Sequence, residues 1–186
     1  MKDADSFDSI HPILYRPFDK QWIYYHDAVI ERSRKEVMQH MFRKNLALAI
    51  GRQGQVVGSE YLWNLAFISD SIIDLNLFYR GGELLFPLYL YKPEEKNKRH
   101  ALQGKMLFEP EVEYGKRGKK PNIAPKVFEQ LEKAYKKIPI PEQILFYCYA
   151  VLYSNSYREK YAEFLKIDFP RIPFTSDYKL FLQMAE

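Results

Sequence analysis

A glycine-flanked polar turn at residues 51–55 (GRQGQ) contains the side chains best suited to reading DNA bases. An apolar run at residues 46–50, short enough to be a buried strand, leads directly into this turn. Arginine can donate two hydrogen bonds to one guanine, and glutamine can pair in the same bidentate way with adenine. The glycines allow the backbone to approach a phosphate closely. The pattern therefore indicates base readout by Arg52, Gln53 and Gln55, and an ordinary polar turn is the alternative.

Clustered cations supply the second candidate chemistry, which is contact with phosphate groups. Residues 92–137 contain 13 Lys and Arg against 7 Asp and Glu, whereas the parts of the chain on either side are nearly balanced. Such a patch attracts polyanions by electrostatics alone, although a solvated loop explains the cluster about as well. The candidate phosphate contacts are Arg16, Arg80, Lys116, Arg117, Lys119 and Lys120.

Residue patterns typical of catalysis are weak. The sequence has no glycine-rich phosphate loop and no His/Cys cluster with zinc spacing, and its four histidines are scattered. Asp70 and Asp74 look site-like, but they follow an expected strand, where a turn or cap is commoner. Cys148 lies in an apolar run and is expected to be a buried, inert thiol. A binding protein is therefore favoured over an enzyme, and an autonomous nuclease is the weakest reading.

The first half of the chain contains mainly strand patterns, with one helix. Strands are expected at residues 22–25, 46–50, 63–69 and 85–91, and a helix capped by Ser33 at residues 33–42. Residues 92–125 are rich in Lys, Glu and Gly and read as a charged loop or hairpin insertion. We divide the chain into a disordered or fraying start at residues 1–11, a core at 12–137 and a helical subdomain at 138–186.

The last third of the chain contains mainly helix patterns. Helices are expected at residues 127–137, 141–165 and 177–184, the second begun by Pro141 and the third capped by Thr175 or Ser176. Residues 169–174 contain two prolines and are expected to be extended. Strands followed by helices favour an α+β fold, with a mixed or antiparallel sheet, a flanking helix and a C-terminal helical subdomain.

The composition of the chain indicates in which cellular compartment it works. No apolar run approaches the roughly 20 residues of a membrane span, and the acidic N-terminus is unlike a signal peptide. One cysteine excludes an internal disulfide and fits a reducing compartment. We expect a cytoplasmic protein with no membrane partner.

Long aromatic-rich strings in this chain resemble the C-terminal specificity region of Type ISP restriction–modification enzymes. The likeness begins at residues 15–25 (YRPFDKQWIYY) and is clear again at residues 157–174 (YREKYAEFLKIDFPRIPF). It includes residues 34–41, 46–53 and 86–91 between them, so that it covers about residues 12–184 except the charged stretch 92–125. Strings of this length and composition are much more specific than a single basic patch.

The resemblance implies a target-recognition domain of an N6-adenine methyltransferase or restriction–modification enzyme. Its implied partners are double-stranded DNA and adjoining methyltransferase, helicase or nuclease domains. No cofactor is expected in this chain, because the catalytic tetrapeptide and the S-adenosylmethionine loop of the family lie upstream of this region.

The resemblance leaves the division of roles open. Recognition domains vary at the positions that read bases, so residues 15–25 are expected to be a packed scaffold strand and residues 169–174 a clamp between helices. The alternative function is a protein-interaction domain without base readout, which would dock a partner through the aromatic face of the helix at residues 141–165.

Overall fold

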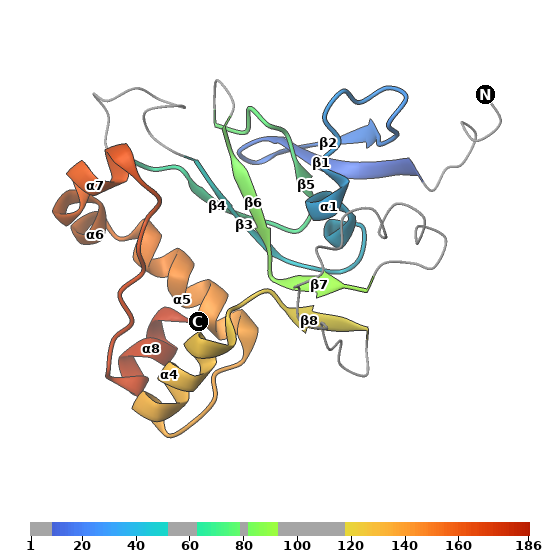
Figure 1. Ribbon diagram of the computed structural model, residues 1–186. Coiled ribbons are helices and arrows are strands. Elements are labelled where there is room, and N and C mark those ends of the chain that lie inside the picture. The colour runs from blue at the N-terminus through green and yellow to red at the C-terminus, as the bar shows by residue number, and fades with distance from the viewer. Residues whose placement is uncertain (1–8, 52–62, 79–81, 93–117) are drawn as a thin grey trace, which may run out of the picture.

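The computed structural model describes residues 9–51, 63–78, 82–92 and 118–186 (Figure 1). The expected α+β class is confirmed. Its strands are β1 (Ile10–Arg16), β2 (Asp19–Tyr24), β3 (Ala47–Ile50), β4 (Ala66–Ser69), β5 (Ile72–Ile73), β6 (Leu84–Pro87), β7 (Tyr89–Tyr91) and β8 (Lys119–Pro121). Its helices are α1 (Lys35–Met38), the 3-10 helix η2 (Gln39–Met41), α4 (Pro125–Tyr135), α5 (Pro141–Tyr153), α6 (Asn155–Lys160), α7 (Ala162–Ile167) and α8 (Tyr178–Met184).

The first sheet is a hairpin with one added strand. β1 and β2 pair antiparallel around a two-residue turn, Pro17 and Phe18, and β5 pairs with β1 in parallel. Pro17 breaks the extended segment as expected, but β1 already begins at Ile10 and β2 already begins at Asp19. β5 was not expected from the sequence.

The central sheet has the antiparallel order β4-β3-β6, and β3 is covered on both faces. Ala47 and Ala49 belong to one core cluster, which they share with the first sheet and with α1 and η2. Ile50 belongs to the other cluster, which contains the helices, and Leu48 packs against it. Alternate residues of a strand point to opposite faces, so a short continuous apolar run is what a strand in the middle of three layers requires.

Residues 85–91, expected to be one strand, form two strands in different sheets. The chain leaves the central sheet at Leu88, whose N–H donates to the carbonyl of Leu46 at 2.7 Å. β7 then pairs with β8, and Leu90 lies opposite Lys120. Of the two expectations for residues 92–125, a loop or a hairpin insertion, the antiparallel pairing of β7 with β8 agrees with the hairpin.

The helix expected at residues 33–42 is shorter than its pattern suggested. Arg34 precedes α1 in a left-handed conformation (φ 50°), and the chain changes to the 3-10 helix η2 at Gln39. Ser33 does not cap the helix, since its hydroxyl donates to the Asp27 carboxylate at 2.8 Å. The predicted capping box was therefore wrong.

The single helix expected at residues 141–165 is three helices. Pro141 begins α5 as predicted, and the Gln143 side chain accepts from the N–H of Ile140 at 3.1 Å. α5 ends before Ser154, whose hydroxyl accepts from the N–H of Tyr157 and starts α6. α8 is capped by Asp177, which accepts from two backbone N–H groups, and not by Thr175 or Ser176 as predicted.

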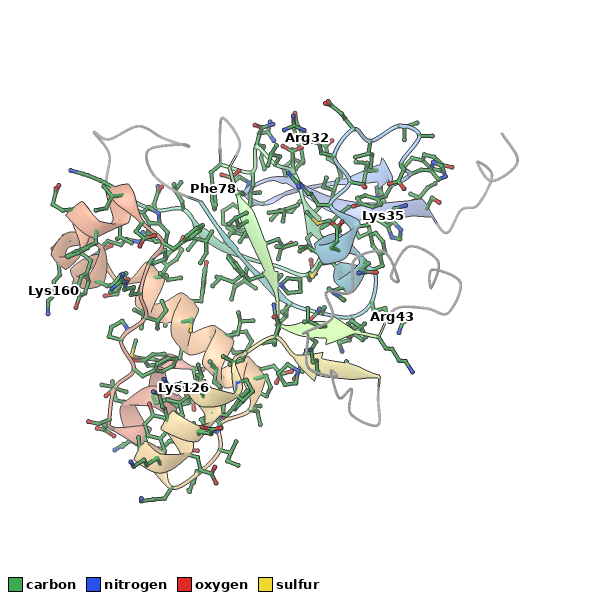
Figure 2. All side chains as sticks on the ribbon, in the orientation of Figure 1. Arg32, Lys35, Arg43, Phe78, Lys126 and Lys160 are labelled. Atoms are coloured by element: carbon green, nitrogen blue, oxygen red, sulfur yellow. The ribbon has the colours of Figure 1, made fainter. Side chains whose placement is uncertain are left out.

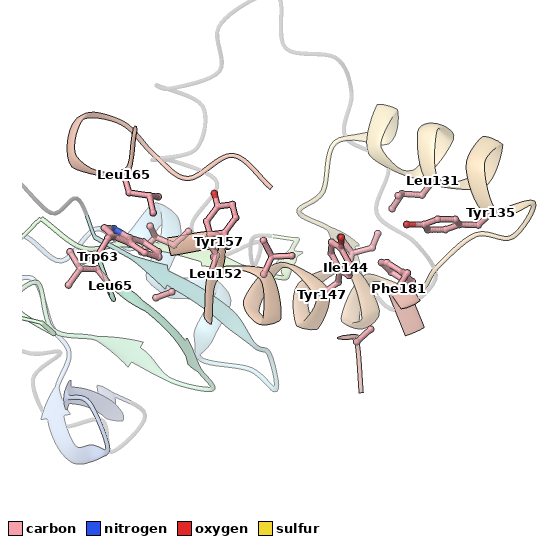
Figure 3. Packing of buried hydrophobic residues seen from close by; sticks show 14 residues of the cluster. Trp63, Leu65, Leu131, Tyr135, Ile144, Tyr147, Leu152, Tyr157, Leu165 and Phe181 are labelled. Atoms are coloured by element: carbon pink, nitrogen blue, oxygen red, sulfur yellow. The ribbon is translucent and has the colours of Figure 1, made fainter. Parts of the chain in front are cut away.

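Helix α5 is the axis of the larger core cluster (Figure 3). At one end it meets residues that cover the central sheet: Trp63, Leu65, Leu152, Tyr157 and Leu165. At the other end, its own residues Ile144 and Tyr147 pack with Leu131 and Tyr135 of α4 and Phe181 of α8. Most apolar side chains of this helix therefore pack within the chain, whereas Tyr153 at its end is 53% exposed. The alternative docking function stays a prediction.

An extended strap follows α7, as the two prolines predicted. Three buried tyrosines, one each from α4, α5 and α6, donate their hydroxyls to strap carbonyls: Tyr135 to Thr175 at 2.6 Å, Tyr147 to Pro173 at 2.8 Å, and Tyr157 to Arg171 at 2.8 Å. Their acceptors are spaced two residues apart, which is the repeat of extended backbone. No helix in the described ranges is long and apolar enough to cross a bilayer.

Candidate nucleic-acid interface

The polar turn predicted to read bases leaves the central sheet at a fixed point. Arg52, Gln53 and Gln55 themselves lie outside the described residues. The residues that border the segment are held together: the N–H of Gly51 donates to the carbonyl of Leu65 at 3.0 Å, and the Trp63 indole N–H donates to the carbonyl of Gly51 at 2.9 Å. The Trp63 side chain is only 1% exposed. Gly51 and Trp63, the residues that border the segment 52–62, are therefore held next to each other.

A basic surface lies over the β7–β8 ribbon. We name Arg43, Lys44, Lys92, Lys119 and Lys120 the basic ribbon, and Figure 2 labels Arg43 among them. Two of the predicted phosphate contacts, Lys119 and Lys120, lie on β8. The N–H of Lys92 donates to the carbonyl of Gly118 at 2.9 Å, which extends the pairing by one step beyond the strands.

Aromatic rings hold several of these cations in place. The Lys119 ammonium lies 3.5 Å from the centre of the Tyr89 ring, and the Arg43 guanidinium lies 5.4 Å from that of Tyr91. The Tyr91 hydroxyl donates to the carbonyl of Lys44 at 2.6 Å, which ties the end of η2 to the ribbon. A cation over an aromatic face keeps its charge while its position is restrained. Two of the five cations, Lys119 and Arg43, are therefore restrained in position.

A buried polar junction attaches the ribbon to the rest of the chain. The Asn45 amide group donates to the carbonyls of His40 and Tyr89, at 3.0 and 2.8 Å, and its oxygen accepts from the N–H groups of Leu46 and Tyr89. His40 Nδ1 accepts from the N–H of Tyr91 at 3.0 Å, and burial lowers the pKa of His40, which favours the neutral ring that can accept. Neither residue was singled out in the sequence, since a lone Asn and a lone His carry no pattern.

The two predicted contact groups leave from opposite ends of the central sheet. Ile50, at the end of β3, lies opposite Ala66 and Leu84, so the segments next to residues 52–62 and 79–81 meet at that end. Ala47, at the start of β3, lies opposite Pro87, after which the chain passes to the basic ribbon. The three residue steps from Ala47 to Ile50 span roughly 10 Å. The sheet thus places Gly51, which precedes the predicted base readout, at the end opposite the one that leads to the basic ribbon.

The remaining predicted phosphate contacts lie elsewhere or outside the described residues. Arg16 forms an ion pair with Asp74, with 3.0 Å between nitrogen and oxygen, and its guanidinium lies 3.9 Å from the Tyr15 ring centre. Arg80, Lys116 and Arg117 are outside the described residues. Arg16 is thus already paired with a carboxylate.

The groups considered for catalysis have structural partners. Asp70 accepts from the Lys20 ammonium at 2.7 Å, and Asp74 pairs with Arg16. Burial raises the pKa of Cys148 to about 12, as expected for an inert thiol. In the described ranges no three His, Cys, Asp or Glu side chains are grouped as metal ligands.

Glu83 is a buried carboxyl beside the end of β6. Its side chain is 5% exposed, and within the described part of the chain neither carboxylate oxygen has a hydrogen-bond partner of good geometry. Desolvation raises the pKa of Glu83 to about 7, and the nearby Asp74 adds to the rise while Arg16 reduces it. Nothing in the sequence marked this residue.

The interpretation of residues 15–25 as packed scaffold was wrong for part of the segment. Tyr25 is buried in a core cluster, but Phe18 is 87% exposed and Trp22 is 74% exposed. β2 is an outer strand whose first four residues are exposed, so its aromatic character does not reflect burial.

Comparison with known proteins gives the family. The model of the Type ISP C-terminal specificity domain matches residues 2–186. The chain belongs to this family. No curated protein matches it.

Solved structures share the fold of this specificity domain. In a cryo-EM structure of a DrdV–DNA complex, a region 26% identical covers 96% of this chain with a TM-score of 0.68. The Type ISP restriction–modification enzyme LlaBIII bound to DNA is 22% identical over the whole chain (TM-score 0.69), and a nuclease-deletion mutant of LlaGI in complex with a DNA substrate mimic is 24% identical (TM-score 0.64). The chain spans only 11–15% of the length of these three proteins.

Proposed function

We propose that this specificity domain recognises a sequence in double-stranded DNA for a Type ISP restriction–modification enzyme of the cytoplasm. The observation that supports this most is the likeness to DrdV, which is in a DNA complex and matches 96% of the chain. Catalysis, including adenine methylation with S-adenosylmethionine, belongs to other parts of the enzyme. This chain would place the duplex so that an adenine can be flipped into the methyltransferase site.

The basic ribbon fits the phosphate-binding part of this role. Lys44 and Lys92 are exposed and form no ion pair with any described residue, while Lys119 is restrained over Tyr89. The Tyr89 hydroxyl donates a hydrogen bond to the carboxylate of Glu142 at 2.7 Å, which holds the ring beneath Lys119. Phosphate contacts set the register and affinity of a protein on DNA without reading sequence.

The segment at the opposite end of the sheet fits the base-reading part. Arg52, Gln53 and Gln55 follow Gly51, which is fixed between Leu65 and Trp63. Because Gly51 is already held in place, less backbone freedom is lost at this residue when DNA binds. Each bidentate contact to a DNA base discriminates against the wrong base by about 1–3 kcal/mol. The protein therefore needs both ends of the sheet for specific binding.

Salt dependence and base preference test the two roles separately. Lys119→Ala together with Lys120→Ala is expected to lower affinity similarly for all duplexes and to reduce the salt slope by up to about 1.8. Arg52→Ala is expected to relax base preference with a smaller change in slope. Lys133→Ala with Lys179→Ala, which removes two exposed cations on α4 and α8, is the matched control.

The measurement is the dissociation constant for a panel of duplexes between 50 and 200 mM salt, on the scale where such effects are large. Equal losses for the ribbon variant and the control would refute the assignment of phosphate contacts. Loss of base preference in the ribbon variant, but not in Arg52→Ala, would refute the division of roles.

A further inference from the structure

The tip of the β1–β2 hairpin displays an aromatic side chain on an unfavourable backbone. Phe18 has φ 67°, in the left-handed region that glycine or asparagine normally occupies at this position of a turn. Its side chain is nevertheless 87% exposed, so little burial compensates for the strain. Its ring meets the Phe67 ring in a T-shaped arrangement, with centroids 5.2 Å apart. Strain at an exposed bulky residue points to presentation of that residue to a partner.

A hollow adjoins this ring. It has a volume of about 270 Å³ and is lined by Leu14, Lys20, Leu46, Phe67, Ile68, Ser69 and Asp70. This is smaller than ordinary ligand pockets, which measure roughly 300–1,000 Å³, and it suits a protein side chain better than a small molecule. Trp22, 74% exposed, is two residues from Lys20 and therefore lies on the same face of β2. We name Phe18, Trp22 and this hollow the aromatic tip.

Two ion pairs fix the aromatic tip to the strands beneath it. Arg16 binds Asp74 at 3.0 Å and Lys20 binds Asp70 at 2.7 Å, so the hairpin is tied both before β5 and after it. A hairpin held in this way loses less conformational freedom when a partner binds.

The charges around the aromatic tip distinguish it from the basic ribbon. The side chains of Asp19, Asp70 and Asp74 outnumber those of Arg16 and Lys20, and both cations are already paired with carboxylates. A phosphate backbone gains little from such a surface. Exposed aromatic residues with neutralised charge are instead typical of the centre of protein–protein interfaces.

We infer that the aromatic tip docks into an apolar socket on the catalytic portion of the same enzyme. This inference rests on the proposed function, and that portion is the natural source of a socket because the related DNA-bound proteins are many times longer than this chain. The interface would hold the specificity domain in register with the methyltransferase while the basic ribbon and the segment 52–62 contact DNA.

Photo-crosslinking in the full-length enzyme tests the occupant. Phe18 is replaced by p-benzoylphenylalanine, and Val29, which is 65% exposed in another turn, receives the same group as the matched control. With a target duplex bound, light is expected to link position 18 to a peptide outside residues 1–186, at least five-fold above the control. Adding Trp22→Ala is expected to lower that yield several-fold. Crosslinks to DNA, crosslinks to a second copy, or a yield equal to the control would each overturn the inference.

A substitution separates docking from folding. Phe18→Gly removes the positive-φ strain along with the ring, so the melting temperature of this chain is expected to stay the same or to rise, and its affinity for duplex DNA to change less than two-fold. A fall in melting temperature of more than about 5 °C would show that Phe18 serves the fold and would overturn the inference. Absence of duplex binding by the unmodified enzyme, with the crosslinks still formed, would instead refute the proposed function and leave the docking intact.

Discussion

Tyr147 fastens the C-terminal strap with two hydrogen bonds, and replacing it with phenylalanine measures what they contribute. Its hydroxyl donates to the carbonyl of Pro173 at 2.8 Å and accepts from the N–H of Thr175 at 2.9 Å. The side chain is 3% exposed and its ring stacks on Phe174 and Phe181, contacts that phenylalanine retains. Tyr147→Phe therefore removes the hydroxyl and little else.

The size of the stability loss depends on whether each hydrogen-bond partner of the Tyr147 hydroxyl is left unpaired. A net hydrogen bond contributes about 1 kcal/mol, and a buried N–H left without an acceptor costs roughly 1–3 kcal/mol more. Thr175 is half-buried, so the lower part of that range applies. We expect Tyr147→Phe to lower the free energy of unfolding by about 2 kcal/mol. Tyr135→Phe and Tyr157→Phe each remove one donor to a carbonyl, and we expect about 1 kcal/mol for each.

Urea unfolding of the three variants, followed by circular dichroism, gives this comparison, and an unchanged m-value shows that the unfolded state is comparable. For a chain of this length, 2 kcal/mol corresponds to a fall in melting temperature of roughly 4–8 °C. Equal losses in all three variants, or a loss below about 0.5 kcal/mol for Tyr147→Phe, would refute the reasoning that the doubly bonded hydroxyl holds the strap.

Three further changes test other parts of the structure. The pKa of Glu83 is raised from 4.5 to about 7, so between these values the folded chain retains a proton that the unfolded chain releases, and the free energy of unfolding falls as pH rises. Glu83→Gln is expected to remove a fall of up to about 3 kcal/mol between pH 5 and pH 8, and urea unfolding at both pH values checks it; an unchanged pH dependence would contradict it. Asn45→Ala leaves several buried backbone groups unpaired, so it is expected to lower the free energy of unfolding by roughly 2–4 kcal/mol and to weaken duplex binding. Urea unfolding and DNA titrations measure the two effects. Undiminished stability would show that the junction is dispensable. Asp177→Ala removes the cap of α8 and is expected to cost about 1 kcal/mol in the same unfolding assay, with Ser176→Ala as the neutral control.

Local patterns predicted those parts of the fold that local contacts determine. The apolar run at residues 46–50 reads as a buried strand because β3 is covered on both faces, and Pro141 begins α5 because proline suits a first helical turn. Prolines also kept residues 169–174 extended. In each case the deciding interaction lies within a few residues of the pattern.

The sequence patterns missed those elements whose structure depends on contacts with residues distant in the sequence. Residues 141–165 carry a continuous helix pattern, yet Ser154 ends α5, and the following helices bring Tyr157 and Leu165 into the core cluster that contains Trp63. Lys119 and Lys120 have poor strand character and become β8 only because β7 offers a partner. Pairing across nearly 30 residues leaves no local signal in either strand.

The candidate site was likewise predicted from the sequence in part and missed in part. Residue chemistry pointed to Lys119 and Lys120, and the structure adds Arg43, Lys44 and Lys92 beside them through η2 and the ribbon. The junction of His40 and Asn45 could not be predicted from the sequence, because the role of the buried Asn45 amide depends on the four backbone groups that it contacts in the fold. The proposed readout by Arg52, Gln53 and Gln55 stays a prediction.

The proposed division of roles separates changes of specificity from changes of affinity. The segments adjoining residues 52–62 and 79–81 leave from the end of β3 at Ile50, whereas the basic ribbon joins at the end near Ala47. Under our proposal, substitutions in the first group alter base preference without changing the His40 and Asn45 junction beside the cations. The aromatic tip, tied to Asp70 and Asp74, belongs to neither group. We therefore expect such a domain to acquire a new target sequence while its phosphate contacts and its orientation on the enzyme stay the same.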